Sequence, residues 1–353
     1  MKTSFELGGE KQIPLFGRND KRELWAPTCA TAGAAAWAGL AVLARMGIAR
    51  VGAIELLFLF APLVTVPLGM ELSRAIGGGD VLHELARRLQ PLGAAFALVA
   101  IWLPPGRKAA LFAIGWIVVC VLMAGSGSVG LARALWSEAG GGARATWIVI
   151  CIARMDLAVG GAWLVASRLG MRLMGIQEPI GLLTAVHFHF AGFATAMIGA
   201  ATLRFAETRA PHEWLRRLVL LVAALPVVVA AGFVISPVAK MVAAVLFSAS
   251  VAGLAIAVRA YGSKAYDATA RILLQVAAAT IFMGMLLSGA YAVADYLGSD
   301  ALTIPEMART HGILNAVGFC LAGLLGWLVE NSTQEAVTDV RSFQTEVERE
   351  PVH

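Results

Sequence analysis

Two histidines separated by one residue, His187 and His189, lie inside a long apolar stretch of the sequence. Histidine changes charge near neutral pH, can donate or accept a proton, and in its neutral form binds zinc, copper and iron. On an α-helix, residues i and i+2 point about 200° apart, so both rings reach one ion only if the helix is broken. The spacing therefore predicts that the two rings face different neighbours, either as hydrogen-bonded structural groups or as groups with a chemical role. Gly192 follows closely and is a residue that loosens a helix.

A second polar pair, His311 and Asn315, lies in another apolar stretch near the C-terminus. Residues i and i+4 share one face of a helix, so these two side chains are expected to act together. Gly312 and Gly318 allow a close approach of another helix. We interpret the pair as facing the segment of His187, with Asn315 either part of a site or a simple interhelical hydrogen-bonding group.

Further ionisable residues interrupt the apolar stretches, and placing one at the bilayer centre costs about 2.5–3.5 kcal/mol, which makes each a functional hypothesis. Asp156 lies in the middle of its stretch, and its partner is expected on another helix. Glu178 precedes Pro179, a favourable place for an acid at the start of a helix. The remaining ones are Glu55, Arg154, Lys240, Asp295 and Glu306.

The composition requires a membrane around these residues. Hydrophobic residues make up 59% of the 353 residues and charged residues only 14%, about half the usual share of a soluble chain. Spanning a bilayer as a helix takes about 20 apolar residues. The fold class predicted is all-α, a polytopic transmembrane helix bundle of about ten spans. The expected spans are 27–48, 51–70, 89–104, 108–126, 145–167, 179–203, 217–236, 238–258, 270–296 and 308–330.

The distribution of Lys and Arg predicts the orientation. Ten spans place most of these residues on the side of the N-terminus, whereas omitting the short third span divides them almost evenly. The positive-inside rule therefore favours ten spans with both termini in the cytoplasm, in the inner membrane of the cell. The expected organisation is a polar tail (1–26), a membrane domain (27–330) and a second polar tail (331–353) that is disordered. The glycine-rich stretch 125–145 is expected to be a loop.

Several classes of protein are excluded or disfavoured. The net charge of +5 suggests nucleic-acid binding, but the basic residues occupy short connections between apolar runs, so no nucleic-acid partner is expected. The four cysteines form no CxxC pair, which argues against a disulfide framework or a thiolate metal site. The sequence contains no phosphate-binding loop, nucleophile elbow or H-E-x-x-H helix.

Three motifs resemble one known family. They are residues 57–69 (LFLFAPLVTVPLG), 183–193 (LTAVHFHFAGF) and 310–319 (THGILNAVGF). Together they are similar to the YndJ-like family of bacterial multi-pass membrane proteins, over roughly residues 50–330. The resemblance implies the helical fold and a bacterial membrane location. It implies no catalytic residues, although "transporter" is used as a label for the family.

Three functions are compatible with these residues. The first is an intramembrane enzyme that isomerises, cyclises or opens an epoxide of a lipophilic substrate. In it His187 or His189 transfers a proton, His311 and Asn315 position the substrate, and Glu178 or Asp156 tunes the imidazole. The second is a proton-coupled secondary transporter that uses the same groups as a relay. The third is a metal or haem site formed by the histidines, with the identity of any cofactor open.

Overall fold

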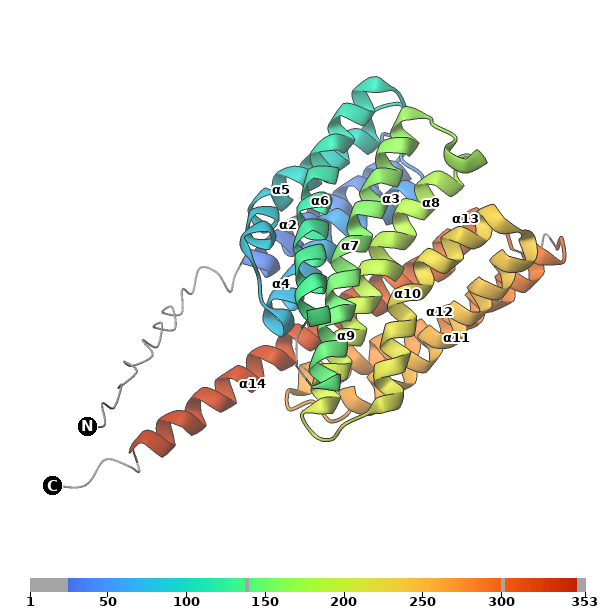
Figure 1. The fold of residues 1–353 in the computed structure, drawn as a ribbon. Helices are drawn as coiled ribbons and strands as arrows, with labels where there is room; N and C mark the ends of the chain where they lie inside the picture. Colours follow the sequence, from blue (N-terminus) through green and yellow to red (C-terminus); the bar gives the residue numbers. More distant parts are fainter. Residues whose placement is uncertain (1–24, 137–139, 300–301, 348–353) are drawn as a thin grey trace, which may run out of the picture.

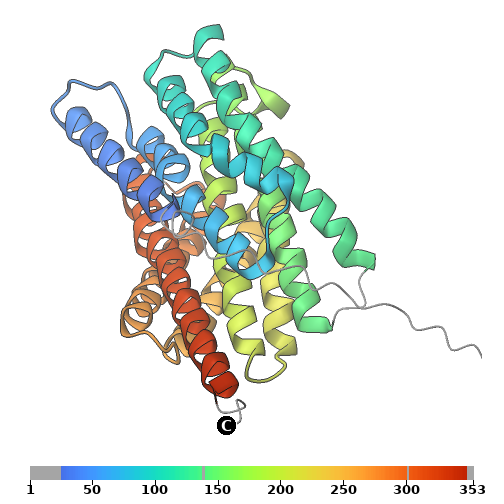
Figure 2. The same ribbon diagram turned by 90° about the vertical axis from the view of Figure 1, so that its left-hand side faces the viewer.

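The chain folds as a series of antiparallel helical passes (Figures 1 and 2). The structure is a computed structural model that describes residues 25–136, 140–299 and 302–347. Most of the predicted tail 1–26 lies outside these residues. The passes are α2 (Trp25–Arg45), α3–η1–α4 (Ala53–Phe60, Ala61–Thr65, Val66–Gly77), α5 (Val81–Trp102), α6 (Arg107–Trp136), α7 (Gly141–Leu169), α8–η3–α9 (Ile180–His187, Phe188–Ala194, Thr195–Glu207), α10 (Glu213–Ile235), α11 (Pro237–Gly262), α12 (Ala268–Tyr296) and α13–η4–η5–α14 (Ile304–Met307, Ala308–Gly312, Leu314–Leu321, Ala322–Val347).

The predicted fold class, an all-helical membrane bundle, is confirmed. Among the described residues, 9 of the passes are long and apolar enough to cross a membrane. The remaining pass, α5, has 22 residues, which is about 33 Å of helix and enough to cross the apolar core of a bilayer. Its first two turns carry Glu84, Arg87 and Arg88, which explains why this span is the least apolar in the sequence.

Contacts between turns define two ends of the bundle. At the first, which we call end A, Gly106 N donates to Arg168 O (2.7 Å) and joins the α5–α6 turn to the end of α7. At the opposite end B, Tyr266 N donates to Glu330 Oε2 (2.8 Å) and joins the α11–α12 turn to α14. The start of α2 also lies at end B, because the Arg87 guanidinium stacks over Trp25. The described chain therefore begins and ends at the same end.

The direction of α5 predicts a labelling result. Gly79→Cys, in the turn before α5, and Lys108→Cys, at the start of α6, are expected to react with a membrane-impermeant maleimide from opposite sides of the membrane. The reason is that α5 separates the two positions by one complete pass. Labelling in intact cells and in inverted vesicles checks this, and reaction of both from one side would contradict a crossing by α5.

Two predicted irregular segments are helical instead. The loop prediction for 125–145 is wrong for the described residues, because α6 continues to Trp136 and α7 begins at Gly141. Its glycines serve helix packing: a Cβ on Gly127 would lie 2.6 Å from Cys151 O of α7. The disorder predicted for the C-terminal tail is wrong up to Val347, because α14 continues beyond the other helices at end B (Figures 1 and 2).

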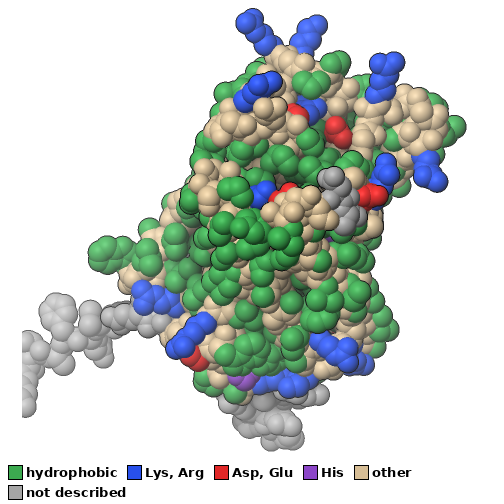
Figure 3. All heavy atoms as spheres, turned by 90° about the vertical axis from the view of Figure 1, so that its right-hand side faces the viewer, with side chains coloured by type: hydrophobic (Ala, Val, Ile, Leu, Met, Phe, Trp, Pro, Cys, Tyr) green, Lys and Arg blue, Asp and Glu red, His purple; other side chains and the backbone are tan. Residues whose placement is uncertain are grey.

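The outer surface has the pattern of a membrane protein. Figure 3 shows a broad band of hydrophobic side chains, with Lys and Arg gathered beyond it at both ends. Large apolar side chains such as Leu111 (67% exposed) and Val121 (54% exposed) face outward. In water such exposure would be unfavourable, whereas in lipid it needs no compensation.

Candidate intramembrane site

Three helices lose their regular α-helical pattern in the middle of the bundle. The π-helical segments η1, η3 and η5 interrupt the second, sixth and tenth passes, and each of the three packs against the other two. Segments of this kind occur frequently at functional sites, because they free backbone groups and re-aim side chains. They coincide with the three sequence motifs around residues 57–69, 183–193 and 310–319. We call η1, η3 and η5 together the π-helical centre.

The sequence explains the distortion of η1. Pro67 has no N–H group, so the carbonyl of Pro62, five residues earlier, lacks a π-helical donor. Gln90 Nε2 of α5 donates to this carbonyl instead (2.6 Å). The neighbouring carbonyl of Leu63 lies against Gly33 of α2, where a Cβ would come within 1.9 Å of the oxygen. Only glycine permits this approach.

His189 is held as a neutral ring between helices. Its Nδ1 donates to Ala185 O (2.7 Å), and its Nε2 accepts from Trp116 Nε1 of α6 (3.0 Å). The ring is fully buried, and it fits because a Cβ on Gly160 of α7 would lie 2.6 Å from Nδ1. Both nitrogens are therefore engaged with the protein, so in this state His189 positions helices.

Asp156 of α7 lies one turn before Gly160, at the same contact between α7 and η3. Its side chain packs against Gly192, where a Cβ would be 2.6 Å from Oδ2. The residue is 3% exposed, and Oδ2 has no hydrogen-bond partner among the described residues. The partner expected on another helix is thus not found for this oxygen. A buried carboxylate without a partner is costly, which makes this group the strongest candidate for reversible proton binding.

Arg154, two residues before Asp156, does have partners on other helices. Its Nη1 donates to Ser126 Oγ of α6 (3.1 Å), and its Nη2 donates to Gly78 O (2.7 Å) and Ser73 Oγ (3.2 Å). A cation at the C-terminal carbonyls of α4 is favourable because of the helix dipole. Arg154 therefore fastens α4 to α6 and α7 and does not neutralise Asp156.

His187 and His189 face different neighbours, as the helix geometry predicted. His187 is exposed, and its Nδ1 donates to Leu183 O of its own helix (2.7 Å). Its Nε2 has no hydrogen-bond partner in the described part of the chain. The sixth and tenth passes come together next to it, because η3 packs against η5.

His311 and Asn315 share a face, and this face lies against α12 at Gly284. His311 Nδ1 donates to Gly284 O (2.8 Å), and Asn315 Nδ2 donates to His311 Nε2 (2.8 Å). Asn315 Oδ1 is buried and has no hydrogen-bond partner among the described residues. The interpretation that both side chains face the His187 segment is wrong for the hydrogen bond of His311, because the close approach at Gly284 directs it to α12.

The acids near end A do not reach the histidines. Glu178 is exposed, and its Oε2 accepts from Leu182 N (3.3 Å), so it caps the start of α8 and does not hydrogen-bond an imidazole. Glu306 closes a capping box with Thr303 at the start of α13. Asp295 of α12 forms an ion pair with Lys240 of α11 (2.6 Å).

The histidines do not form a metal site with one another. Among the described residues, no three His, Cys, Asp or Glu side chains come together in a way that could hold a metal ion. His189 and His311 also have both ring nitrogens occupied by protein partners. The residues present therefore do not fit the shared metal or haem site considered from the sequence.

Two polar residues of the spans were missed by sequence reasoning. Thr65 in η1 is fully buried and its hydroxyl has no partner among the described residues, and Trp116 fixes the ring of His189. Threonine and tryptophan are frequent in membrane helices, so neither stood out. The π-forming prolines Pro62 and Pro67 were the available signal for Thr65.

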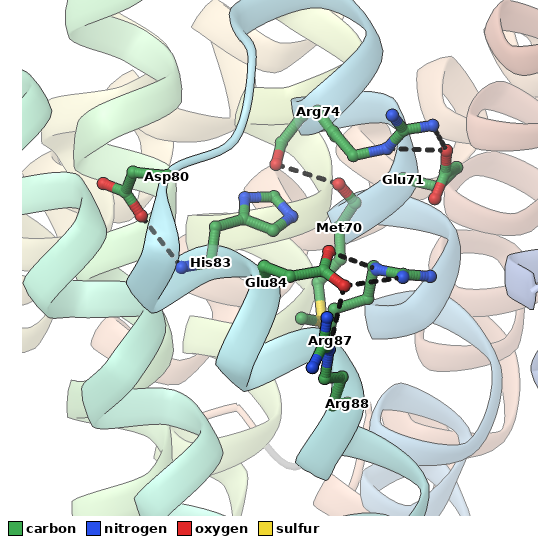
Figure 4. Close-up of polar contacts among 9 residues, drawn as sticks. Met70, Glu71, Arg74, Asp80, His83, Glu84, Arg87 and Arg88 are labelled. Atoms are coloured by element: carbon green, nitrogen blue, oxygen red, sulfur yellow. Dashed lines mark hydrogen bonds and ion pairs between the residues drawn. The ribbon is translucent and has the colours of Figure 1, made fainter. Parts of the chain in front are cut away.

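His83, which had no predicted role, is also completely buried. It lies at end B between α4 and α5, where Figure 4 shows it among Asp80 and the pairs Arg74–Glu71 and Arg87–Glu84. Neither ring nitrogen has a partner in the region the structure describes. Its position in a charged connection of the sequence gave no indication of burial.

These features define the class of the protein: a multi-pass α-helical membrane protein with a polar centre where three interrupted helices meet. A family model for YndJ-like protein matches residues 56–319, and the chain belongs to this family. The chain is similar to the membrane protein YndJ of Bacillus subtilis (strain 168), with 28% identity over 190 residues. That alignment covers 53% of this chain and 34% of the relative, so the chain matches about a third of that protein's length. No solved structure matches.

Proposed function

We propose that the protein is a proton-coupled secondary transporter with its site at the π-helical centre. The observation that carries this proposal is the meeting of three interrupted helices, η1, η3 and η5, with α7 packed against η3. Within the described residues, buried polar atoms of Thr65 in η1, Asn315 in η5 and Asp156 in α7 have no hydrogen-bond partner. Secondary transporters typically bind substrate and coupling ion near the bilayer midplane, where helices are discontinuous. The intramembrane enzyme has less support, because both ring nitrogens of His189 and of His311 are hydrogen-bonded to the protein.

Asp156 is the proposed proton carrier. In a site without water, a carboxyl group has a lower free energy when it is protonated than when it is charged. It loses the proton more easily when water enters the site. His189 lies at the same contact between α7 and η3, and its two hydrogen bonds hold it neutral. Arg154, on the same helix, points to α4 and α6 and forms no ion pair with Asp156.

The arrangement of helices suits alternating access. Figure 1 shows α10, α11 and α12 inclined against α6, α7 and α8. At end B, α4 is fastened by Arg154 and by Arg204 of α9, which donates to Ala75 O (3.1 Å). We infer that α4, which follows the distorted segment η1, moves when these arginines release its carbonyls.

A substrate-free experiment tests the proposal. Thr65→Cys, in a variant whose four native cysteines are replaced by alanine, is expected to react with a membrane-impermeant maleimide from either side of the membrane. The exchange of Thr for Cys is conservative because the hydroxyl has no hydrogen-bond partner among the described residues. Labelling in intact cells and in inverted vesicles measures access from each side.

Matched positions make the result decisive. Val121→Cys faces lipid and should not react from either side, whereas Lys108→Cys and Lys264→Cys should each react from one side only, opposite to one another. Reaction of Thr65→Cys from one side alone, or from neither side while the controls behave as expected, would contradict alternating access.

One observation favours the enzyme as a second candidate. His187 is exposed within a span, and its Nε2 has no hydrogen-bond partner in the part of the chain that the structure describes, so a lipophilic substrate could reach it from the bilayer. The same assay separates the two functions, because a lateral catalytic site requires no access to Thr65 from both aqueous sides.

A further inference from the structure

Two arginines and a lysine surround the turn between α11 and α12 at end B. Arg209, just after α9, donates from Nη2 to Lys264 O (3.3 Å). Arg271 of α12 donates from Nη1 to Ala265 O (2.9 Å) and to Tyr266 O (3.1 Å). Consecutive carbonyls of residues 264–266 thus hold two guanidinium groups beside the Lys264 side chain. We call Arg209, Lys264 and Arg271 the turn cations.

Aromatic rings support these cations at the edge of the apolar band. The Arg209 guanidinium lies 3.9 Å over the Phe205 ring and 6.0 Å from the Tyr266 ring centre. The Lys264 ammonium lies 5.4 Å over Tyr261. Tyr266 is 62% exposed, as expected for an aromatic residue at the level of lipid headgroups. Lys and Arg gather beyond the hydrophobic band at this end (Figure 3).

The nearby acids are occupied by backbone groups. Glu330 is 1% exposed, and its Oε2 accepts from Tyr266 N and Asp267 N. Asp267 Oδ1 accepts from Ala270 N as the cap of α12. Within the described residues, neither acid forms an ion pair with a turn cation, so the outward side of the turn is positively charged.

We propose that the turn cations bind the phosphate group of an anionic phospholipid, with its acyl chains on the adjoining helices. Basic pockets between transmembrane helices bind the headgroups of anionic lipids in this way. Guanidinium groups suit phosphate oxygens, and Arg209 and Arg271 are already fixed in place by their hydrogen bonds. Ile256 (60% exposed) and Ile272 (65% exposed) offer apolar surface to the acyl chains on α11 and α12. A free phosphate ion has the same oxygen atoms as the lipid headgroup, so it is the competing ligand.

Native mass spectrometry of the full chain in a neutral detergent tests this proposal. Dioleoylphosphatidylglycerol is expected to bind more tightly than dioleoylphosphatidylcholine. Each change of a turn cation to glutamine should weaken binding of the anionic lipid about fivefold, and the triple variant about a hundredfold. Arg217→Gln is the matched control, because Arg217 is at the same end but is paired with Glu213 (3.1 Å) and should bind as the wild type does.

Three outcomes would overturn the proposal. They are unchanged lipid binding by the triple variant, and a loss of binding in Arg217→Gln as large as in the single turn-cation variants. The third is competition by sodium glycerol phosphate as strong as that by the lipid, which would show a site for free phosphate. If the arginine variants fold poorly, Lys264→Gln still tests the proposal. Its backbone carbonyl continues to accept the hydrogen bond from Arg209, because the change affects only the side chain. A normal affinity in that single variant would also count against the lipid site.

Discussion

Asp156→Asn is expected to abolish the pH dependence of access to the π-helical centre. In the Thr65→Cys background, the ratio of labelling from the two sides should change at least about tenfold between about pH 5 and about pH 9 when Asp156 is present. Asparagine has nearly the same shape but cannot take up a proton, so the ratio should become constant. The measurement is the rate of maleimide labelling from each side at several pH values, corrected with a surface cysteine for the reactivity of the thiol.

Glu178→Gln is the matched control for this experiment. Glu178 lies just before the start of the sixth pass, and its carboxylate accepts a hydrogen bond from Leu182 N of α8 at end A. Its loss should leave the pH dependence intact. A pH dependence that persists in Asp156→Asn would remove this residue from the proton pathway, and the coupling proposal would then fail even if access alternates.

Gly33→Ala is expected to have the largest effect on folding. An added Cβ would lie 1.9 Å from Leu63 O and 2.7 Å from Leu63 C, and both are backbone atoms that no side-chain rotation can move. Either α2 must shift away or η1 must change its conformation. Overpacking against side chains costs about 1–3 kcal/mol, and a collision with backbone is expected to exceed that range.

Gly39→Ala on the same helix provides the control. A Cβ there meets nothing within 4 Å, so the change should be neutral or stabilise α2 by up to about 1 kcal/mol. The two variants are compared by heating each in detergent and measuring, by size-exclusion chromatography, the fraction of protein that remains monodisperse at each temperature. Equal stability of Gly33→Ala and Gly39→Ala would show that α2 does not pack on η1 this closely.

The number of passes and their positions along the chain could be predicted, because they depend on local composition. Long apolar stretches must form helices in lipid, where every backbone polar group needs an internal partner. The predicted spans therefore correspond to the observed passes, including the weakly apolar α5. The predictions for 125–145 and for the C-terminal tail were wrong because glycine and polar residues do not interrupt a helix whose neighbours support it. In α6 the glycines instead allow α7 to approach closely, which requires knowledge of the neighbouring helix.

The candidate site could be predicted only as a set of residue types. The sequence marked Asp156, His187, His189 and the pair of His311 and Asn315 as costly groups within spans, and it predicted that the first two histidines diverge. Which group keeps a free atom depends on partners far along the chain. Trp116 hydrogen-bonds His189, and Gly284 hydrogen-bonds His311. In the part of the chain that the structure describes, Oδ2 of Asp156 has no hydrogen-bond partner.

By itself, the sequence determined that this protein is a membrane helix bundle with polar groups inside its spans. Hydropathy and helical periodicity are properties of neighbouring residues, so no tertiary information was needed. Only the tertiary structure decided that η1, η3 and η5 meet, and that Oδ2 of Asp156 on the neighbouring α7 has no hydrogen-bond partner within the described residues. Contacts between distant passes are set by complementary shapes such as Gly192 against Asp156, which are not visible in either segment alone.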